Sequence, residues 1–282
     1  MSTLTAPDTA PSTSAIPAAP MGSQYGGRDG LRASTQHVLT LAGRTITKIR
    51  RTPEQLVDAT LQPILFVILF VYLFGAAVAG SRHDYTEFVI PSIMAQTLLF
   101  ASMTIGVNLN TDIKKGVFDR FRSLPISRSA PLIGAVLGEL VRFVIGACFV
   151  IGFGYVIGFR VHTNAFEAIA GVLLVLLFAI SVCWVSVFIG MLVREPGAVQ
   201  GFGFLLMFPL TFGSTTFVKA ATLPGWLQAW VHVNPVTHLV EAVRGLMLGG
   251  PVAWPVAQSL LWSFGIAAVF MPLAIRAYRR KV

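Results

Sequence analysis

Six long apolar segments, separated by short polar stretches, constrain the fold of this chain more than any other feature. A helix of ~20 apolar residues spans the hydrocarbon core of a bilayer, and each segment is about that long. Charged residues make up only 12% of the chain, about half of the ~25% that is typical of soluble domains. We therefore expect an all-α polytopic membrane protein, which excludes most soluble enzymes and binding modules. The six predicted transmembrane helices cover about residues 60–79, 88–109, 131–158, 166–192, 199–217 and 256–275.

The distribution of lysine and arginine orients these helices. Sixteen of the 21 basic residues lie before the first segment, after the second, after the fourth or after the sixth, and only four lie in the alternate connections. Basic residues accumulate on the cytoplasmic side of a membrane protein, so both termini are predicted to be cytoplasmic. The net charge of +9 is then explained by orientation in the cell membrane, and we expect no nucleic-acid partner.

The region before the first segment divides into two parts. Residues 1–30 are rich in Ser, Thr, Pro, Ala and Gly, a composition that predicts a disordered cytoplasmic tail. Residues 31–51 have an apolar helical face opposite basic residues, which predicts an amphipathic interfacial helix. An ordinary basic linker is the alternative. The transmembrane domain then extends over residues 52–282. The basic residues assigned to the interfacial helix include Arg44, Lys48 and Arg51.

The loop after the second segment predicts a short cytoplasmic helix. Phe118, Phe121 and Leu124 recur every three residues, and basic residues lie between them. A surface helix with an aromatic face fits a groove in a partner, although the aromatic rings could equally pack on the ends of the neighbouring helices. The residues assigned to this segment are Lys114, Lys115, Gly116, Phe118, Asp119, Arg120, Phe121, Arg122, Leu124 and Pro125.

The connection between the fifth and sixth segments predicts two short outer helices. Residues 224–230 place two tryptophans four residues apart, as in an interfacial aromatic belt. Asn234 and Pro235 then end that helix and begin a second one, on which Glu241 and Arg244 are spaced to form an ion pair. Whether these helices enter the bilayer stays open.

Two sequence stretches together resemble one protein family. They are Gly116-Val-Phe-Asp-Arg-Phe-Arg-Ser-Leu-Pro-Ile-Ser127 and Asn234-Pro-Val-Thr-His-Leu-Val-Glu-Ala-Val-Arg-Gly245. In this order, with six predicted spans and an interfacial helix ahead of them, they resemble the permease subunits of ABC type-2 transporters. The likeness covers about residues 35–282 and is closest to actinobacterial daunorubicin-resistance-type drug exporters. Its outer signature comprises Asn234, Pro235, Glu241, Arg244 and Gly245.

The resemblance implies a partner arrangement and a function. Two copies of the permease, most simply a homodimer, would bind two cytoplasmic ATPase subunits in a bacterial cell membrane. The helix at 116–124 and the interfacial helix at 31–51 would dock the ATPase. The complex would export a hydrophobic or amphipathic small molecule, such as an antibiotic in self-resistance. The family has no short motif that fixes its ligand, so the substrate-binding residues are unknown at this stage.

The chain contains no Gly-x-x-x-x-Gly-Lys-(Ser/Thr) loop, so ATP and Mg²⁺ are expected on the partner subunit and not here. Its five histidines are scattered without the spacing of metal ligands, and no metal site or cofactor is expected in this chain. Cys148 and Cys183 both fall inside apolar segments, which favours small buried side chains over a disulfide.

Glu139 and Arg142 form a charged pair inside the third segment, three residues apart. Ionisable groups within a membrane are costly and often functional, so a role in gating or in contacting the substrate is one hypothesis. The alternative is a pair near the cytoplasmic mouth whose long side chains reach water. The fifth segment is rich in phenylalanine, which predicts either a path for an aromatic substrate or ordinary packing and lipid contact.

Two other functions compete with drug export. A member of the same family could export a lipid or a polysaccharide. An ion-coupled secondary transporter would need isolated carboxylates near the bilayer midplane and inverted repeats, and only Glu139 fits the first requirement. A membrane-embedded enzyme is disfavoured because no nucleophile and base, or metal ligands, occur together.

Overall fold

The computed structural model describes residues 53–75, 80–116 and 130–281, and all regular secondary structure in these residues is helical. The all-α prediction is confirmed for this part of the chain. The predicted tail, the predicted interfacial helix with Arg44, Lys48 and Arg51, and residues 117–125 of the predicted cytoplasmic segment lie outside the described residues.

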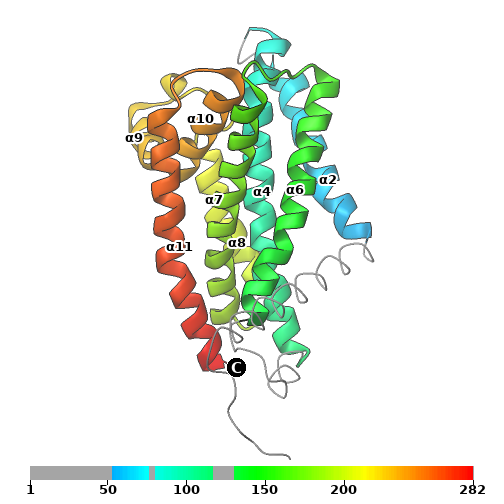
Figure 1. Ribbon diagram of the computed structural model, residues 1–282, viewed down its shortest axis with the longest axis vertical. Helices are drawn as coiled ribbons and strands as arrows, with labels where there is room; N and C mark the ends of the chain where they lie inside the picture. Colours follow the sequence, from blue (N-terminus) through cyan, green and yellow to red (C-terminus); the bar gives the residue numbers. More distant parts are fainter. Residues whose placement is uncertain (1–52, 76–79, 117–129, 282) are drawn as a thin grey trace, which may run out of the picture.

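Long apolar helices form the body of the molecule (Figure 1). Four described helices are long and apolar enough to cross a membrane, and two shorter apolar stretches, Leu61–Phe74 and Pro196–Phe212, accompany them. The helices overlap all six predicted segments, while their number of crossings and their orientation stay predictions. They are α2 (Pro53–Ile68), which continues as the π-helix η1 (Leu69–Phe74), α4 (Arg82–Lys114), α6 (Ala130–Ile157), α7 (Ala165–Leu192), α8 (Pro196–Phe212) and α11 (Ala253–Lys281).

Helix α8 ends before its predicted segment does. The predicted segment runs to Phe217, but the helix stops at Phe212 and Gly213 caps it, where the sequence changes to Gly-Ser-Thr-Thr. Pro209 within the last turn lacks an N–H group and weakens the helical hydrogen bonding there. The residues that follow form turns and the 3₁₀ turn η2 (Ala220–Thr222).

Two short helices join α8 to α11 at one end of the bundle, opposite the C-terminal end of α11 (Figure 1). They are α9 (Gly225–Val233) and α10 (Pro235–Leu248). Asn234 caps α10 by accepting a hydrogen bond from the Val236 N–H at 2.9 Å, and Pro235 occupies the first helical position. The Asn-Pro sequence therefore separates the two helices, as the spacing predicted.

Helices α4 and α7 approach each other almost backbone to backbone. The Gly106 N–H donates to Ser186 Oγ at 3.0 Å, and the same hydroxyl donates to the Met103 carbonyl at 2.7 Å. A Cβ atom at position 106 would lie 2.2 Å from the Ser186 carbonyl oxygen. Small residues permit this close packing between helices in membranes, and α4 and α7 consequently form the centre of the bundle.

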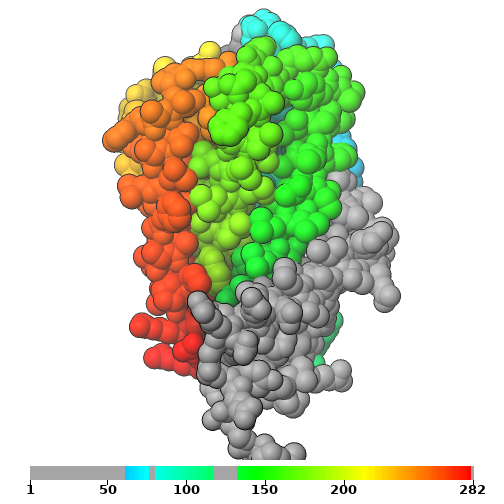
Figure 2. All heavy atoms as spheres, in the orientation of Figure 1, coloured from blue at the N-terminus to red at the C-terminus, as the bar shows by residue number. Residues whose placement is uncertain are grey.

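The outside of the bundle is apolar. Figure 2 shows α11, α7 and α6 side by side on one face. Only 11% of the most apolar stretch of α11 is buried inside the protein, against 72% of the corresponding stretch of α4. An exterior of this kind suits a lipid environment and would be a liability in water. Large apolar side chains that lie exposed include Leu65, Leu73, Val156, Phe166, Leu205 and Leu261.

Candidate functional site: a cavity with a charged wall

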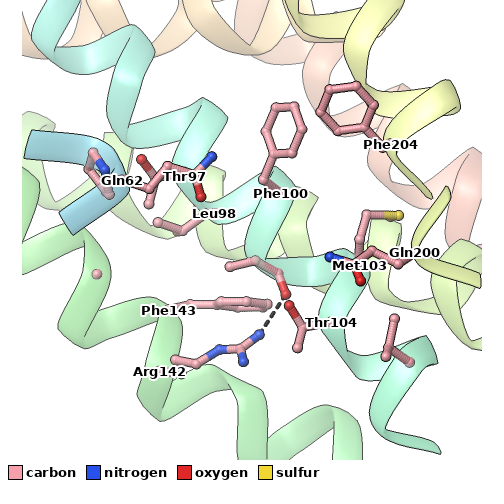
Figure 3. A pocket seen from close by; sticks show the side chains of 14 residues that line it. Gln62, Thr97, Leu98, Phe100, Met103, Thr104, Arg142, Phe143, Gln200 and Phe204 are labelled. Atoms are coloured by element: carbon pink, nitrogen blue, oxygen red, sulfur yellow. Dashed lines mark hydrogen bonds between the residues drawn. The ribbon is translucent and has the colours of Figure 1, made fainter. Parts of the chain in front are cut away.

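A cavity of about 480 Å³ lies between α2, α4, α6 and α8 (Figure 3). Three phenylalanine rings and several aliphatic side chains form its apolar lining, and neutral polar side chains together with one arginine add polar groups. Ligand cavities for drug-sized molecules have volumes of about 300–1,000 Å³ and are mostly apolar with a few polar groups. The aromatic residues are Phe100, Phe143 and Phe204, and the polar residues are Gln62, Thr97, Thr104, Arg142 and Gln200.

Helical spacing brings these side chains together. On α4, Thr97, Ala101 and Thr104 are three or four residues apart and face the cavity from one side of the helix. On α8, Gln200 and Phe204 are one turn apart. The Thr97 hydroxyl donates to the Ile93 carbonyl at 2.7 Å, so its oxygen can accept a further hydrogen bond but its own proton is already engaged.

One member of the predicted charged pair, Arg142, lines this cavity, and Glu139 lies three residues before it on α6. Arg142 Nη2 is 2.8 Å from Glu139 Oε2, and both residues are more than 90% buried. The same nitrogen donates to the Ala101 carbonyl on α4 at 2.5 Å, the bond drawn in Figure 3. Pairing offsets part of the cost of burying each charge, and the bond to Ala101 ties α6 to α4 beside the cavity.

The spacing on α10 suggested that Arg244 pairs with Glu241. This prediction is wrong, since the salt bridges among the described residues do not include that pair. Instead its Nε donates to the Phe88 carbonyl at 2.9 Å, and Nη2 lies within 2.6–2.9 Å of Ser92 Oγ and the Thr215 and Thr216 carbonyls. The guanidinium carbon is 3.4 Å from the centre of the Phe88 ring.

Arg244 makes these bonds because α8 ends at Phe212. In residues 213–217, the unwound segment, backbone carbonyls have no helical partners and need other donors. Arg244 supplies donors to two of them, and the Asn234 amide supplies donors to the Leu210 and Gly213 carbonyls at 2.8 and 2.9 Å. Two residues of the outer signature thus hold the unwound segment in place.

Gly245, another signature residue, makes room for the turn that follows α10. A Cβ atom there would lie 2.9 Å from Val252 Cγ1 and 3.4 Å from the Pro251 carbonyl oxygen. Glu241 is partly exposed on α10. Arg244 and Gly245 therefore have structural roles that the sequence pattern alone did not reveal, as do the bonds of Asn234 to the Leu210 and Gly213 carbonyls.

Phenylalanine rings connect the cavity to the unwound segment. The Phe100 and Phe204 ring centres are 6.1 Å apart, and ring contacts continue along α8 to Phe212. Phe217 then stacks on Phe70 of η1 at 3.9 Å. The rings nearest η1 pack on one another, whereas Phe204 lines the cavity.

The first residues of the predicted cytoplasmic helix belong to the end of α4. Lys114 is the last residue of α4, Lys115 caps it, and Gly116 has a positive φ of 66° at which the chain turns. Lys114 pairs with Glu195 at 2.5 Å. In residues 53–75, 80–116 and 130–281, no group of three His, Cys, Asp or Glu side chains is placed to hold a metal ion.

The sequence alone did not reveal the cavity. Apart from Arg142, its polar residues are neutral and lie inside apolar segments, where they carry a weaker signal than a charged pair. Thr97 and Thr104 are seven residues apart, two helical turns, and lie on the same side of α4 as Ala101. That spacing is a signal that could have identified the polar face of α4, but the partner helices could not have been deduced from it.

This chain is similar to transporter permeases over most of its length. Residues 36–248 match the model of a family described as ABC-2 type transporter. The chain is 37% identical over 256 residues to the daunorubicin resistance ABC transporter permease protein DrrB1 of Streptomyces coeruleorubidus, a match that covers 91% of this chain and 90% of the relative. It is 26% identical to the probable doxorubicin resistance ABC transporter permease protein DrrC of Mycobacterium tuberculosis, over 90% of this chain and 92% of that protein. It is also 27% identical to the putative transport permease ycf38 of Cyanophora paradoxa, over 75% and 74% of the two chains.

Proposed function

Because the chain belongs to the ABC-2 type transporter family, we propose that it is the permease of an exporter for a hydrophobic or amphipathic drug-sized compound. It is a multi-pass membrane protein, and a separate ATPase subunit hydrolyses the ATP that drives transport. Relatives named for daunorubicin and doxorubicin resistance make daunorubicin the first substrate to test. Self-resistance to an antibiotic is the role that this activity would serve.

The cavity between α2, α4, α6 and α8 is the observation that carries the proposal. Its volume of about 480 Å³ suits a drug-sized molecule. Its aromatic side can stack on a planar apolar ring system, and its glutamine and threonine side chains can bond to oxygen or nitrogen atoms at the edge of that molecule. Arg142, held by Glu139, adds a hydrogen-bond donor without adding net charge to the wall.

In the assembly that we propose, two permeases form a homodimer and bind two ATPase subunits. The ATPases carry ATP and Mg²⁺ and dock on the segment around 116–124 and on the predicted interfacial helix at 31–51. Both termini lie in the cytoplasm. The substrate leaves the cytoplasm or the inner leaflet, occupies the cavity, and passes outward between the two copies as ATP is hydrolysed.

Purification and transport together test this function. The chain is expressed with its ATPase subunit, solubilised gently, and examined for ATPase that co-purifies with it. Cells that express both subunits should accumulate several-fold less daunorubicin than cells with an ATPase-dead partner. Failure of any nucleotide-hydrolysing subunit to co-purify would contradict the proposal.

The same preparation separates drug export from the lipid or polysaccharide alternative. In vesicles, a drug exporter concentrates daunorubicin on one side when ATP is supplied. A complex that hydrolyses ATP, leaves daunorubicin where it was and moves a fluorescent lipid between leaflets would favour lipid export instead. An ion gradient should drive neither movement in the absence of ATP.

A further inference from the structure

The turn between α7 and α8 is fastened to the last turns of α4. Asn110 of α4 is 1% exposed. Its side-chain amide donates to the Gly190 carbonyl at 2.9 Å and to the Val193 carbonyl at 2.7 Å. The last carbonyls of a helix have no partners within that helix. Asn110 therefore caps the end of α7 from a different helix.

A second contact lies one turn further along α4. Lys114 Nζ is 2.5 Å from Glu195 Oε2, and Glu195 is the residue that precedes the first turn of α8. Because residues four apart share one face of a helix, Asn110 and Lys114 present the same face of α4. That face holds both the end of α7 and the beginning of α8.

Helix α8 links the turn after α7 to the cavity, because it packs on α4 along one line. Its buried residues recur every four positions and form one narrow stripe, comprising Val199, Gly203, Met207 and Thr211. A Cβ atom on Gly203 would meet the Met103 side chain of α4 at 3.2–3.3 Å, so the two helices are in close contact along this line. Gln200 and Phe204, beside the stripe, line the cavity.

The chain leaves α4 immediately after these contacts. Lys115 caps the helix and Gly116 turns the backbone. The segment on which the proposed ATPase docks begins at this point, only a few residues from Lys114. Lys114 and Asn110 therefore make the α4 contacts described above that lie nearest to that segment along the chain.

We propose that Asn110 and the Lys114–Glu195 pair are positioning residues that transmit the movement of the ATPase-docking segment to α8, and through α8 to the cavity. This inference rests on the proposed function. Neither contact touches the substrate or ATP. Asn110 makes the larger contribution because it is buried and bonds twice, whereas exposed ion pairs contribute little by themselves and Lys114–Glu195 mainly fixes the start of α8.

The test measures coupling, as molecules of ATP hydrolysed per molecule of daunorubicin moved, in vesicles that contain the permease with its ATPase. Asn110→Leu removes both donors at similar volume. It should raise this ratio at least fivefold while ATP hydrolysis without drug stays within twofold of the wild-type rate. Lys114→Glu and Glu195→Lys should each raise the ratio about twofold, and the variant with both changes should return toward the wild-type value because the pair is restored in reverse.

Arg194 provides a matched control. It is exposed, adjoins Glu195, and makes no salt bridge among the described residues. Arg194→Glu should leave the ratio unchanged, and a twofold rise in this variant would show a general charge effect and overturn the role of the pair. The exposed Glu195 variants keep the test decisive if Asn110→Leu does not fold.

The outcomes separate the two proposals. A wild-type complex that exports nothing would overturn the proposed function, and this inference with it. A wild-type complex that exports daunorubicin, with variants that keep its ATP-to-drug ratio, would overturn the inference alone. A purely structural role would lower the yield or thermal stability of the variants without changing the ratio.

Discussion

Two opposite charges, on Glu139 and Arg142, lie buried one helical turn apart on α6 beside the cavity. Arg142 also bonds to α4 through the Ala101 carbonyl. Burying an arginine is costly unless an opposite charge or hydrogen-bond acceptors compensate for the lost water. The stability of this wall and its chemistry toward a ligand therefore depend on the same two residues.

Glu139→Gln should reduce the stability of the permease by about 3 kcal/mol, because Arg142 then stays buried without its opposite charge. The double variant Glu139→Gln with Arg142→Met should recover most of that loss and still bind its ATPase. It should nevertheless export daunorubicin more slowly. Thermal unfolding of the purified chain and drug accumulation in cells measure the two effects, and unchanged export in the double variant would contradict a transport role.

Phe204 and Phe202 lie on the same helix and provide a matched comparison. The two rings are about equally exposed, Phe204 at 57% and Phe202 at 54%, but only Phe204 lines the cavity and contacts Phe100. Aromatic contacts are worth about 0.5–1.5 kcal/mol, which corresponds to roughly two- to tenfold in affinity. Phe204→Ala should weaken daunorubicin binding by that factor, as measured by quenching of drug fluorescence. Phe202→Ala should bind as the wild type does, and equal losses in both variants would place the drug elsewhere.

At the scale of helices, the bundle has a tightly packed centre and a looser side. Helices α4 and α7 meet at Gly106 and Gly190 with almost no side chain between them. Helix α8, by contrast, is buried along only one stripe. The cavity lies on the looser side, where a change of shape costs fewer contacts.

Gly106→Ala tests the packed centre. The added methyl group would meet the Ser186 backbone at 2.2 Å, so the helices must separate, and we expect a loss of about 1–3 kcal/mol. At Gly152 of α6 a Cβ atom has no neighbour within 4 Å. There Gly152→Ala should gain up to about 1 kcal/mol from helix propensity. Unfolding of both variants in the same detergent gives the comparison, and a neutral Gly106→Ala would mean that α4 and α7 are less closely packed than described.

The apolar segments were sufficient to predict where helices lie, because the need to satisfy backbone groups in lipid leaves little choice. They did not predict that α8 stops at Phe212, since the predicted segment extends through the small residues 213–216 to Phe217. Arg244 illustrates the same limit. Its spacing pointed to Glu241, but its actual partners lie on α4 and after α8. Contacts between helices depend on how the bundle packs, which the period of a single helix does not encode.

At the scale of the whole molecule, the basic residues predict which end of the bundle faces the cytoplasm. The α7–α8 turn and the connection before α9 lie at opposite ends of α8. Thr222 and Arg194 are exposed at these two positions. Their environments should therefore differ if the predicted orientation holds.

Cysteine labelling tests this orientation in a chain whose Cys148 and Cys183 are first replaced by serine. A membrane-impermeant maleimide should label Thr222→Cys in intact cells, whereas Arg194→Cys should react only after the membrane is opened. The reverse pattern would invert the predicted topology, and labelling of both from outside would rule out a membrane-spanning α8.

The bonds of Arg244 have a consequence for the order in which the protein is made. This residue bonds to Phe88 and Ser92, which precede it by 156 and 152 residues. Most of the chain must therefore be synthesised and inserted before the beginning of α4, which contains Phe88 and Ser92, acquires these bonds. Until then the carbonyls of Thr215 and Thr216 have no guanidinium to bond with. Truncated chains that stop before α10 should accordingly be early targets for membrane proteases.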